Sequence, residues 1–440
     1  MGKPISGFSK LSKSKKIDWI VETYFSNLLS AKETIKQYWN TNEKLQQLHD
    51  EFIENTITNY YLPLGVAPNF LINDKLYTIP MAIEESSVVA AASKAAKFWL
   101  DRGGFKANVI STKKIGQVHF KYFGEKSKLE SFFSHIKPQF FADCKPITKN
   151  MIARGGGIID IKLRDKTNEI DGYFQLHATF ETLDAMGANF INSCLEQFSK
   201  TFIREAELSN EVNRNDFEIV MSILSNYVPE CLVKVEVSCA VQELNEDNTI
   251  SPNDFAKKFV EAVKIAEVEP FRAVTHNKGI MNGIDAVVLA TGNDFRAIEA
   301  GVHAFASRNG QYTSLSHASV ENGVFKFWME VPLALGTVGG LTKLHPLVKL
   351  SLEMLRNPSA KELMQITAAV GLAQNFGALR SLITTGIQQG HMKMHLMNIL
   401  NQLEATPEEK LVLTEHFKTR TVSHSNVMQA IKDLRSLKNQ

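Results

Sequence analysis

Apolar positions recur at more than one spacing along this chain, and the stretch from Pro270 to Gly310 contains the sharpest change of pattern. It opens with a polar, basic segment, Arg272 to Lys278, that we interpret as a loop. From Ala286 to Ala290 every residue is apolar. Because this run is short and bounded by turn residues, we predict a strand buried on both faces. A helix is predicted to follow, with its apolar stripe formed by Ile298, Val302 and Phe305.

The first hundred residues also have patterns that predict helices and strands. Apolar residues recur at roughly helical spacing from Ile17 to Leu29, and Tyr77 to Met81 is typical of a strand. An alanine-rich helix is predicted to begin at Glu84-Glu85 and to stop at Gly103. Alanine is the best helix former and glycine commonly ends helices, so both limits have a physical reason.

Further along, the predicted elements follow the order strand, helix, strand, strand, helix, strand. They are a strand with Val118, Phe120 and Tyr122, a helix at 125–136, strands at 159–163 and 174–180, a helix at 186–207 and a last strand at about 231–241. This order is that of a ferredoxin-like unit. We interpret it as an inserted domain, after which the chain returns to a larger one.

The predicted fold class is therefore α+β, a mixed α/β fold of three domains. At 440 residues the chain is longer than a usual single domain. The predicted domains are a large domain at 1–112 and 226–385, the inserted ferredoxin-like domain at 113–225, and a small helical C-terminal domain at 386–440. Glycines at 386 and 390 would allow the last domain to act as a flap over the site.

Composition narrows the class of protein. Hydrophobic residues make up 44% and charged residues 22%, a globular balance, and the formal net charge is only +2. So small a charge argues against nucleic acid or an acidic membrane surface as a partner. No apolar run is long enough to span a bilayer. The four cysteines show no CxxC pairing, and we expect reduced, mostly buried thiols in a cytoplasmic protein.

The residues alone leave the candidate chemistry open. Lys278 and Asp294 flank the predicted strand and could meet at one site. However, an aspartate there is also a good helix N-cap, and a lysine in a glycine-rich loop is usually solvated. Glu85 at a helix start is stabilised by the helix dipole and needs no further role. His391 and His395 stand four apart, but we reject zinc because no third ligand is evident.

Several motifs together resemble one family. The segments are THNKGIMNGID and ATGNDFRAIEAGVHAFASR in the central stretch, EESSVVAAA from Glu84, DAMGAN from Asp184 and GIQQGHM from Gly386. These segments occur in the same order along the chain as in class II 3-hydroxy-3-methylglutaryl-coenzyme A (HMG-CoA) reductases, and the similarity covers nearly the whole chain. The chain departs from the family pattern at Ser86, where the family has proline, and at Glu54–Thr58, where only part of a subunit-contact motif survives.

The resemblance implies roles for individual residues. Four are implied to be catalytic, namely Glu85, Lys278, Asp294 and His391. Three are implied to bind the substrate, namely Arg272, Asn282 and Ser87. The implied dinucleotide-binding residues are Asp184, Ala185, Met186, Gly187, Ala188, Asn189 and Asn226. No GxGxxG or P-loop motif offers another nucleotide site.

The resemblance also implies an activity. HMG-CoA would be reduced to mevalonate and free coenzyme A with two molecules of NADPH or NADH and no metal. The site is implied to lie at the subunit interface of a dimer or hexamer. An ungapped count places Thr148 where NADH-preferring relatives carry an aspartate, which favours NADPH because a carboxylate repels the 2′-phosphate. The alternatives are a catalytically silent homologue that senses acyl-CoA or dinucleotide, and the reverse reaction in mevalonate degradation.

Overall fold

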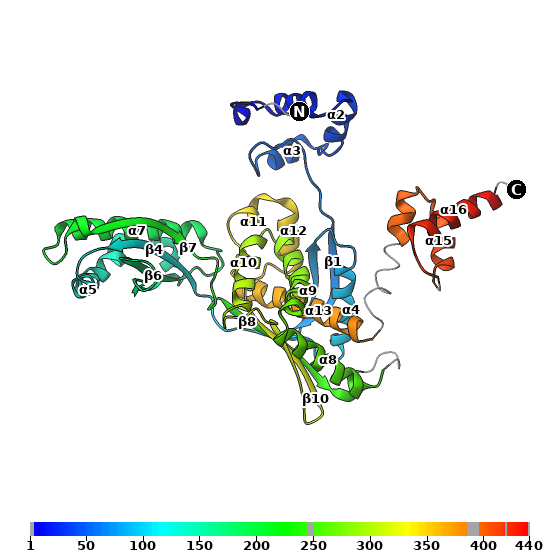
Figure 1. The fold of residues 1–440 in the computed structure, drawn as a ribbon. Helices are drawn as coiled ribbons and strands as arrows, with labels where there is room; N and C mark the ends of the chain where they lie inside the picture. Colours follow the sequence, from blue (N-terminus) through cyan, green and yellow to red (C-terminus); the bar gives the residue numbers. More distant parts are fainter. Residues whose placement is uncertain (1–3, 245–249, 385–395, 419, 439–440) are drawn as a thin grey trace. The chain divides into compact units, whose positions relative to one another are not determined.

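The computed structural model describes residues 4–244, 250–384, 396–418 and 420–438. As predicted, the fold mixes helices with antiparallel strands (Figure 1). Contacts within the chain divide it into two compact units, Met1–Pro63 and Leu64–Gln440. The N-terminal helical segment, which we had assigned to the large domain, therefore forms a unit of its own.

The first unit has three short helices. They are α1 (Lys13–Tyr24), α2 (Leu28–Gln37) and α3 (Glu43–Asp50). Each begins at a side chain that accepts a hydrogen bond from the first turn, namely Ser12, Asn27 and Asn42. Among the described hydrophobic residues of this unit, only Ile17 and Val21 are buried. So small a core implies that polar contacts hold much of the unit together.

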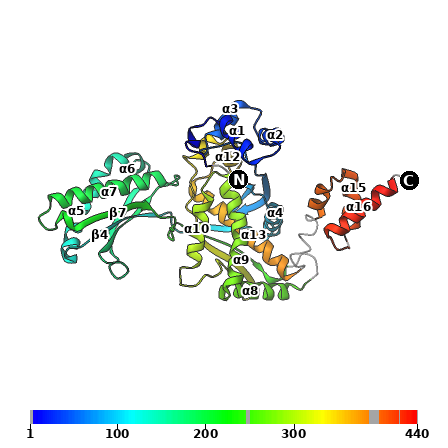
Figure 2. The same ribbon diagram turned by 45° about the horizontal axis from the view of Figure 1, so that its top comes forward.

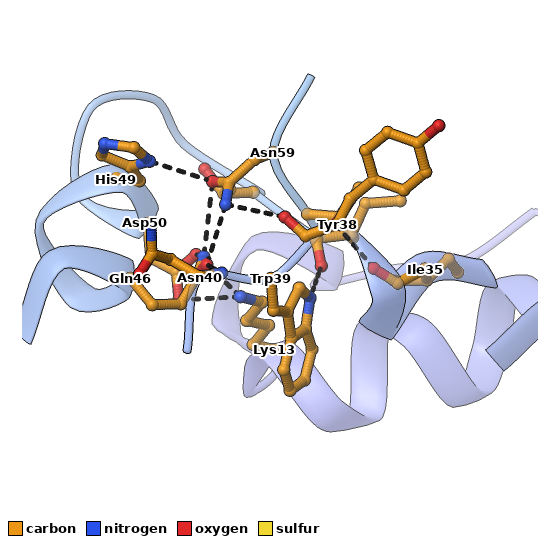
Figure 3. A network of polar contacts seen from close by, with 12 residues as sticks. Lys13, Ile35, Tyr38, Trp39, Asn40, Gln46, His49, Asp50 and Asn59 are labelled. Carbon is orange, nitrogen blue, oxygen red and sulfur yellow. Dashed lines mark hydrogen bonds and ion pairs between the residues drawn. The ribbon is translucent and has the colours of Figure 1, made fainter. Parts of the chain in front are cut away.

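Those polar contacts form the network in Figure 3. The Gln46 amide donates to Asp50 over 2.7 Å and accepts from Asn59 over 2.8 Å. Lys13 donates to the same Asp50 carboxylate at 2.7 Å, and its Nζ lies 4.2 Å from the centre of the Trp39 ring. Because the network joins α1, α3 and the segment after them, it links parts of the unit that share few apolar contacts.

The second unit begins with a two-stranded sheet and a helix. These are β1 (Leu64–Ile72), β2 (Lys75–Ala82) and α4 (Val88–Leu100). A four-stranded antiparallel sheet has the order β3-β8-β10-β9. Its strands are β3 (Lys106–Val109), β8 (Leu232–Ala240), β10 (Val324–Pro332) and β9 (Ser316–Glu321). Cys231 and Cys239 are both buried, as the alternating pattern of this strand predicts.

Helices surround this sheet. They are α8 (Pro252–Val268), α9 (Pro270–Ala290), α10 (Phe295–Ala306), α11 (Leu341–Leu344), α12 (Pro346–Met354) and α13 (Ala360–Ile383). An aromatic cluster fills the core between them and the sheet. Trp99 of α4 and Phe376 of α13 have ring centroids 5.2 Å apart, and Phe259 of α8 lies 5.2 Å from Phe325 of β10. All four rings are buried.

The predictions for the start of the central stretch were wrong. The segment Arg272 to Lys278 is no loop, and Ala286 to Ala290 is no strand, because both belong to α9. The apolar run is buried against neighbouring helices, and a short apolar run has the same composition in a buried strand and in a buried helix. The helix predicted after Asp294 is confirmed as α10.

The inserted part has its own sheet and core. Its strands, in the sheet order β5-β6-β4-β7, are β5 (Gly157–Asp165), β6 (Tyr173–Glu181), β4 (Lys114–Tyr122) and β7 (Phe217–Leu224). Helices α5 (Lys126–Asp143), α6 (Lys145–Ile152) and α7 (Ala188–Leu208) lie on one face of this sheet, as Figure 2 shows. The ferredoxin-like order is present. However, its last strand is β7, whereas the predicted strand at 231–241 is β8 of the other sheet.

The C-terminal part has a separate small core. Its helices include α15 (Pro407–His416) and α16 (His424–Lys438). Leu400, Leu413 and Val427 are buried within this part. A capping box formed by Thr406 and Glu409 starts α15. The limits of the three predicted domains stay a prediction.

Within the described ranges, no helix is long and apolar enough to cross a membrane.

Candidate active site

Helix α9 presents one of its side chains, Lys278, to solvent from its middle turns. The helix begins at Glu269, whose carboxylate accepts hydrogen bonds from the Phe271 and Arg272 N–H groups, and Pro270 occupies the first turn. An acidic cap and a first-turn proline both favour a helix start. The polar residues that follow are therefore helical, and helix geometry sets the direction in which each of their side chains points.

Two polar residues before Lys278 face inward and fix the helix. His276 is buried and its Nε2 lies 2.6 Å from the Ser316 hydroxyl, which in turn donates to Asn375 of α13. Burial lowers the pKa of His276 to about 3, so this imidazole is neutral. Asn277, fully buried, donates to the Thr313 carbonyl at 2.9 Å and accepts from a backbone N–H. Both residues are structural, and they set the rotation of α9.

A glycine lets α9 cross α13 closely. A Cβ on Gly283 would lie 2.7 Å from the Val370 carbonyl oxygen, which is too close for any other residue without a backbone shift. Gly279 differs, since a Cβ there would meet nothing within 4 Å. The helix surface is therefore open at Gly279, next to Lys278, and tightly packed one turn further along at Gly283.

The structure brings Glu85 to Lys278. Lys278 Nζ donates to the Glu85 carboxylate over 3.0 Å, across 193 positions of sequence. Glu85 lies in the short turn between β2 and α4. The side chains are 62% and 36% exposed respectively, so this pair is accessible to a ligand. An exposed lysine–glutamate pair contributes little to stability, which leaves both groups free to serve chemistry.

Asp294 lies elsewhere in the same chain. Its carboxylate caps α10 and accepts hydrogen bonds from the backbone N–H groups of Arg296 and Ala297. The Arg296 guanidinium binds it at 3.0 Å. Partial burial alone would raise the pKa of Asp294, but these hydrogen bonds outweigh it and the pKa is lowered. Twelve residues of α9, roughly 18 Å of helix, separate Lys278 from the C-terminal end that precedes Asp294. In the described chain Lys278 pairs with Glu85 and Asp294 pairs with Arg296, so a meeting of Lys278 and Asp294 stays a prediction.

The predicted substrate-binding residues lie on α9 and at the start of α4, the two elements next to the Lys278–Glu85 pair. Asn282 is one turn further along α9, at a spacing that puts it on the same face as Lys278. Arg272 is half-buried in the first turns, and burial lowers its pKa. Ser87 occupies the N-cap position of α4, close in sequence to Glu85. His391 lies outside the residues that the structure describes.

The predicted dinucleotide motif forms a tight turn before α7. Gly187 has a φ of 89° and precedes the first residue of the helix. Asp184 directs its carboxylate to the Ala360 N–H at the start of α13, over 2.7 Å, and its carbonyl accepts from Thr337 at 2.8 Å. A Cβ on Gly336 would lie 2.4 Å from the Met186 nitrogen, so glycine is required at this close approach. The turn is thus packed against the glycine-rich loop that contains Gly336.

The same loop connects this turn to the segment that carries Asp294. The Gly336 N–H donates to the Asn293 side chain over 2.8 Å. Asn226, the other predicted cofactor residue, has its carbonyl against Gly301 of α10, where a Cβ would approach to 2.6 Å. Asn226, Met186 and Ala188 line one cavity together with Gly301. The residues predicted to hold the dinucleotide therefore lie together, near Asp294.

The sequence did not single out Asn293 for this connection, or Lys114, whose ammonium lies under the Asp184–Asn189 turn. An asparagine before a helix indicates only a cap, and a lysine at the start of an alternating strand is usually solvated. Neither residue gives a signal without the tertiary structure. Within the described ranges, no group of three or more His, Cys, Asp and Glu side chains is arranged to hold a metal ion.

Comparisons with known proteins agree on one family. The family model described as hydroxymethylglutaryl-coenzyme A reductase matches residues 15–396. The chain is 36% identical over 412 residues to the 3-hydroxy-3-methylglutaryl-coenzyme A reductase of Archaeoglobus fulgidus, covering 93% of this chain and 89% of that protein. It is 35% identical over 407 residues to a probable reductase of the same name from Borreliella burgdorferi, covering 91% and 89%.

Solved structures of similar fold come from Streptococcus pneumoniae. Its 3-hydroxy-3-methylglutaryl-coenzyme A reductase matches with a TM-score of 0.72 at 34% identity, over 98% of this chain and all of that chain. A structure of the class II enzyme bound to NADPH in open conformations matches with a TM-score of 0.71 at 34% identity, over 92% and 99% of the two chains.

Proposed function

Because this chain belongs to the hydroxymethylglutaryl-coenzyme A reductase family, we propose that its Lys278–Glu85 pair is the centre at which HMG-CoA is reduced to mevalonate and coenzyme A. The observation that carries the assignment to these residues is their 3.0 Å contact across 193 positions of sequence. An accessible ammonium held by a carboxylate is suited to a substrate whose carbonyl oxygen gains negative charge.

Each side chain of the pair has a task in the proposed reaction. The Lys278 ammonium stabilises the charge that develops on the substrate oxygen, first in the thioester and then in the aldehyde. Glu85, in direct contact with this ammonium, supplies a proton when the aldehyde oxygen becomes a hydroxyl.

The substrate-binding residues fit the ends of HMG-CoA. Arg272 binds the free carboxylate of the substrate by a charge-assisted contact, which suits its fixed fork of donors. Asn282, on the face of α9 that carries Lys278, donates to the reacting oxygen. Ser87 adds a hydroxyl beside Glu85. His391 protonates the departing coenzyme A thiolate, a step suited to a group that titrates near neutrality.

The turn from Asp184 to Asn189 fits a dinucleotide. Small residues open α7, and helix N-termini attract phosphate groups. The cavity lined by Met186, Ala188 and Asn226 provides apolar surface beside this turn. NADPH is the proposed cofactor, supported by Thr148 in place of an acidic residue and by the NADPH-bound Streptococcus pneumoniae relative. When bound, it supplies the two hydrides that the reduction needs.

A second copy of the chain completes the proposed site. Asp294 and the dinucleotide turn are joined through Asn293 and Gly336, whereas Lys278 lies roughly 18 Å before the end of α9. Asp294 of a second copy could reach Lys278 if the exposed faces of α9 meet. Phe271, 88% exposed, gives this helix apolar surface to bury in such a dimer. A cytoplasmic location, consistent with four free and buried cysteines, is part of the same proposal.

A coupled assay tests this function. On addition of HMG-CoA we expect oxidation of NADPH, with two molecules consumed for each free thiol released, and slower oxidation of NADH. If the folded protein oxidises neither cofactor, the chain is a silent homologue. If mevalonate, coenzyme A and the oxidised cofactor react faster at ambient concentrations than HMG-CoA and the reduced cofactor do, the result would instead favour the degradative direction.

A further inference from the structure

Lys114 is a buried lysine that the proposed mechanism does not use. It is the first residue of β4, and it is only 5% exposed. Lysine is almost never so deeply buried without a partner. Within the described part of the chain no carboxylate forms an ion pair with it, and its hydrogen bonds go to neutral oxygens instead. Its presence therefore calls for an explanation other than a salt bridge.

The Lys114 ammonium holds the turn that carries the dinucleotide motif. Its Nζ donates to the Thr182 hydroxyl at 2.6 Å and to the Ala185 carbonyl at 2.8 Å. The Thr182 hydroxyl donates to the same Ala185 carbonyl at 2.7 Å. Gly187 lies close above, since a Cβ there would meet the Thr182 side chain at 2.5 Å. The ammonium is thus directly beneath the first residues of the motif and the start of α7.

Two carboxylates act on the Lys114 ammonium from nearby, but within the described residues neither forms a direct ion pair with it. Burial lowers the pKa of Lys114, while Cys231, Glu181 and Asp184 act in the opposite direction. Glu181 is engaged by the Thr112 hydroxyl and by the Leu183 N–H, and Asp184 by the Ala360 N–H. Both carboxylates thus already accept hydrogen bonds elsewhere. Lys114 also lines the cavity beside Met186, Ala188 and Asn226.

We propose that Lys114 is a positioning residue of the dinucleotide site, which fixes the Asp184–Asn189 turn and supplies positive potential beneath the diphosphate of the cofactor. The inference rests on the proposed function, because it requires a dinucleotide at this turn. An anion bound above the turn adds negative charge beside an ammonium that has no direct ion-pair partner among the described residues. Binding the dinucleotide and retaining the proton on Lys114 then favour each other.

Replacing Lys114 by methionine tests this role, because methionine keeps the length and removes the charge. We expect the Kd for NADPH to rise about tenfold in Lys114→Met, the effect typical of losing a charge-assisted contact. The KM for HMG-CoA should stay unchanged. Thermal stability should be retained, since the Thr182–Ala185 hydrogen bond remains and a buried charge is removed. Lys114→Arg, which keeps the charge, should recover part of the affinity.

Lys113→Met is the matched control. Lys113 is adjacent in sequence but exposed, and it pairs with Glu230 at 3.4 Å. Its replacement should leave the Kd for NADPH within about twofold of the wild type, as expected for a surface pair.

The pH dependence of binding gives a second, independent readout. NADPH binding by the wild type should weaken as pH rises through the pKa of Lys114, which burial lowers below that of a free lysine. Burial raises the pKa of the Cys231 thiol to about 11, so this thiol loses its proton only above the pH at which Lys114 does. The Lys114→Met protein should lack this dependence.

The outcomes separate the two proposals. If the wild type does not bind NADPH or NADH, the proposed function itself fails. If it binds and Lys114→Met binds equally well at every pH, only the role of Lys114 is overturned. A Lys114→Met protein that unfolds at lower temperature, yet binds NADPH normally once folded, would assign the lysine to stability alone.

Discussion

At the scale of single residues, neighbours on α9 have opposite roles because the helix turns them to opposite sides. His276 and Asn277 are buried in hydrogen bonds to the sheet and to α13, whereas Lys278 is 62% exposed. The buried pair sets the rotation of the helix, and this rotation directs Lys278 to Glu85. This short segment therefore contains two buried residues that fix the helix and one exposed residue that is proposed to react.

Removing the ammonium should abolish turnover without unfolding the protein. For Lys278→Ala we expect kcat to fall by about 100- to 1,000-fold or more, because a preorganised charge at the developing oxyanion is lost. The melting temperature should change little, since the pair is exposed. Lys75→Ala is the matched control. Lys75 pairs with Glu362 at 3.1 Å with similar exposure, and this variant should keep its activity. Retained turnover in Lys278→Ala would remove the lysine from the mechanism.

The charge of Asp294 should contribute to stability in a pH-dependent way. Its folded pKa is lowered, so its contribution is present above the unfolded pKa and is lost as pH falls through the folded pKa. Asp294→Asn keeps a cap but removes the charge. We expect this variant to be less stable than the wild type near neutrality, by about 0.3–1 kcal/mol, because a partly exposed charge at a helix start is screened. At acidic pH the unfolding free energies of the variant and the wild type should converge. A stability difference that is constant with pH would contradict this assignment.

At the scale of elements, the crossing of α9 and α13 is the contact on which the site depends. Gly283 approaches the Val370 carbonyl, and Gly371 approaches Ile284, so each helix has a glycine where the other presses against it. α13 also begins at the Asp184 carboxylate and supplies Asn375 to the buried network around His276. The dinucleotide turn and the lysine helix are therefore attached to the same element.

Two glycine-to-alanine substitutions on α9 should have opposite effects. Gly283→Ala should destabilise the protein by about 1–3 kcal/mol, because a Cβ would overlap the Val370 carbonyl oxygen. Gly279→Ala should be neutral or stabilise by about 0.5–1 kcal/mol, because the position is helical and open. Denaturant unfolding of both variants measures the difference. Equal effects would show that the close crossing does not exist in solution.

At the scale of the whole molecule, the middle and the C-terminal end of α9 belong to different parts of the proposed chemistry. One end leads to Asp294 and the dinucleotide turn, and the middle carries Lys278. Roughly 18 Å of helix lies between Lys278 and the end of α9, and Asp294 is bound to Arg296, so we infer that the proposed site combines groups from two copies of the chain. Two copies related by a twofold axis would form two identical composite sites.

Mixed dimers test this arrangement. Lys278→Ala and Asp294→Ala should each be inactive alone. If Asp294 acts on the lysine of the other copy, a purified dimer containing one of each variant has one intact site, and we expect about half of the wild-type kcat per dimer. Dimers in which both substitutions are on the same chain, paired with a wild-type chain, should retain no intact site. An inactive mixed dimer in the first case would show that the two residues act within one chain.

The sequence alone determined those features that local physics controls. The helix cap at Asp294 was recognisable because a cap needs only a side-chain oxygen near the first turn. The strand and helix order of the inserted sheet followed from periodicity, except for its last strand. The candidate residues Glu85, Lys278 and Asp294 came from the resemblance of their motifs to a family, since spacing by itself left each with an ordinary structural reading.

The tertiary structure decided what depends on distant neighbours. The run from Ala286 to Ala290 is helical because α9 continues through it and buries it, and its composition fits a strand equally well. Only the fold brings Glu85 to Lys278 and places the Lys114 ammonium under the dinucleotide turn. These placements arise from packing between segments that are far apart along the chain, and local sequence patterns do not contain that information.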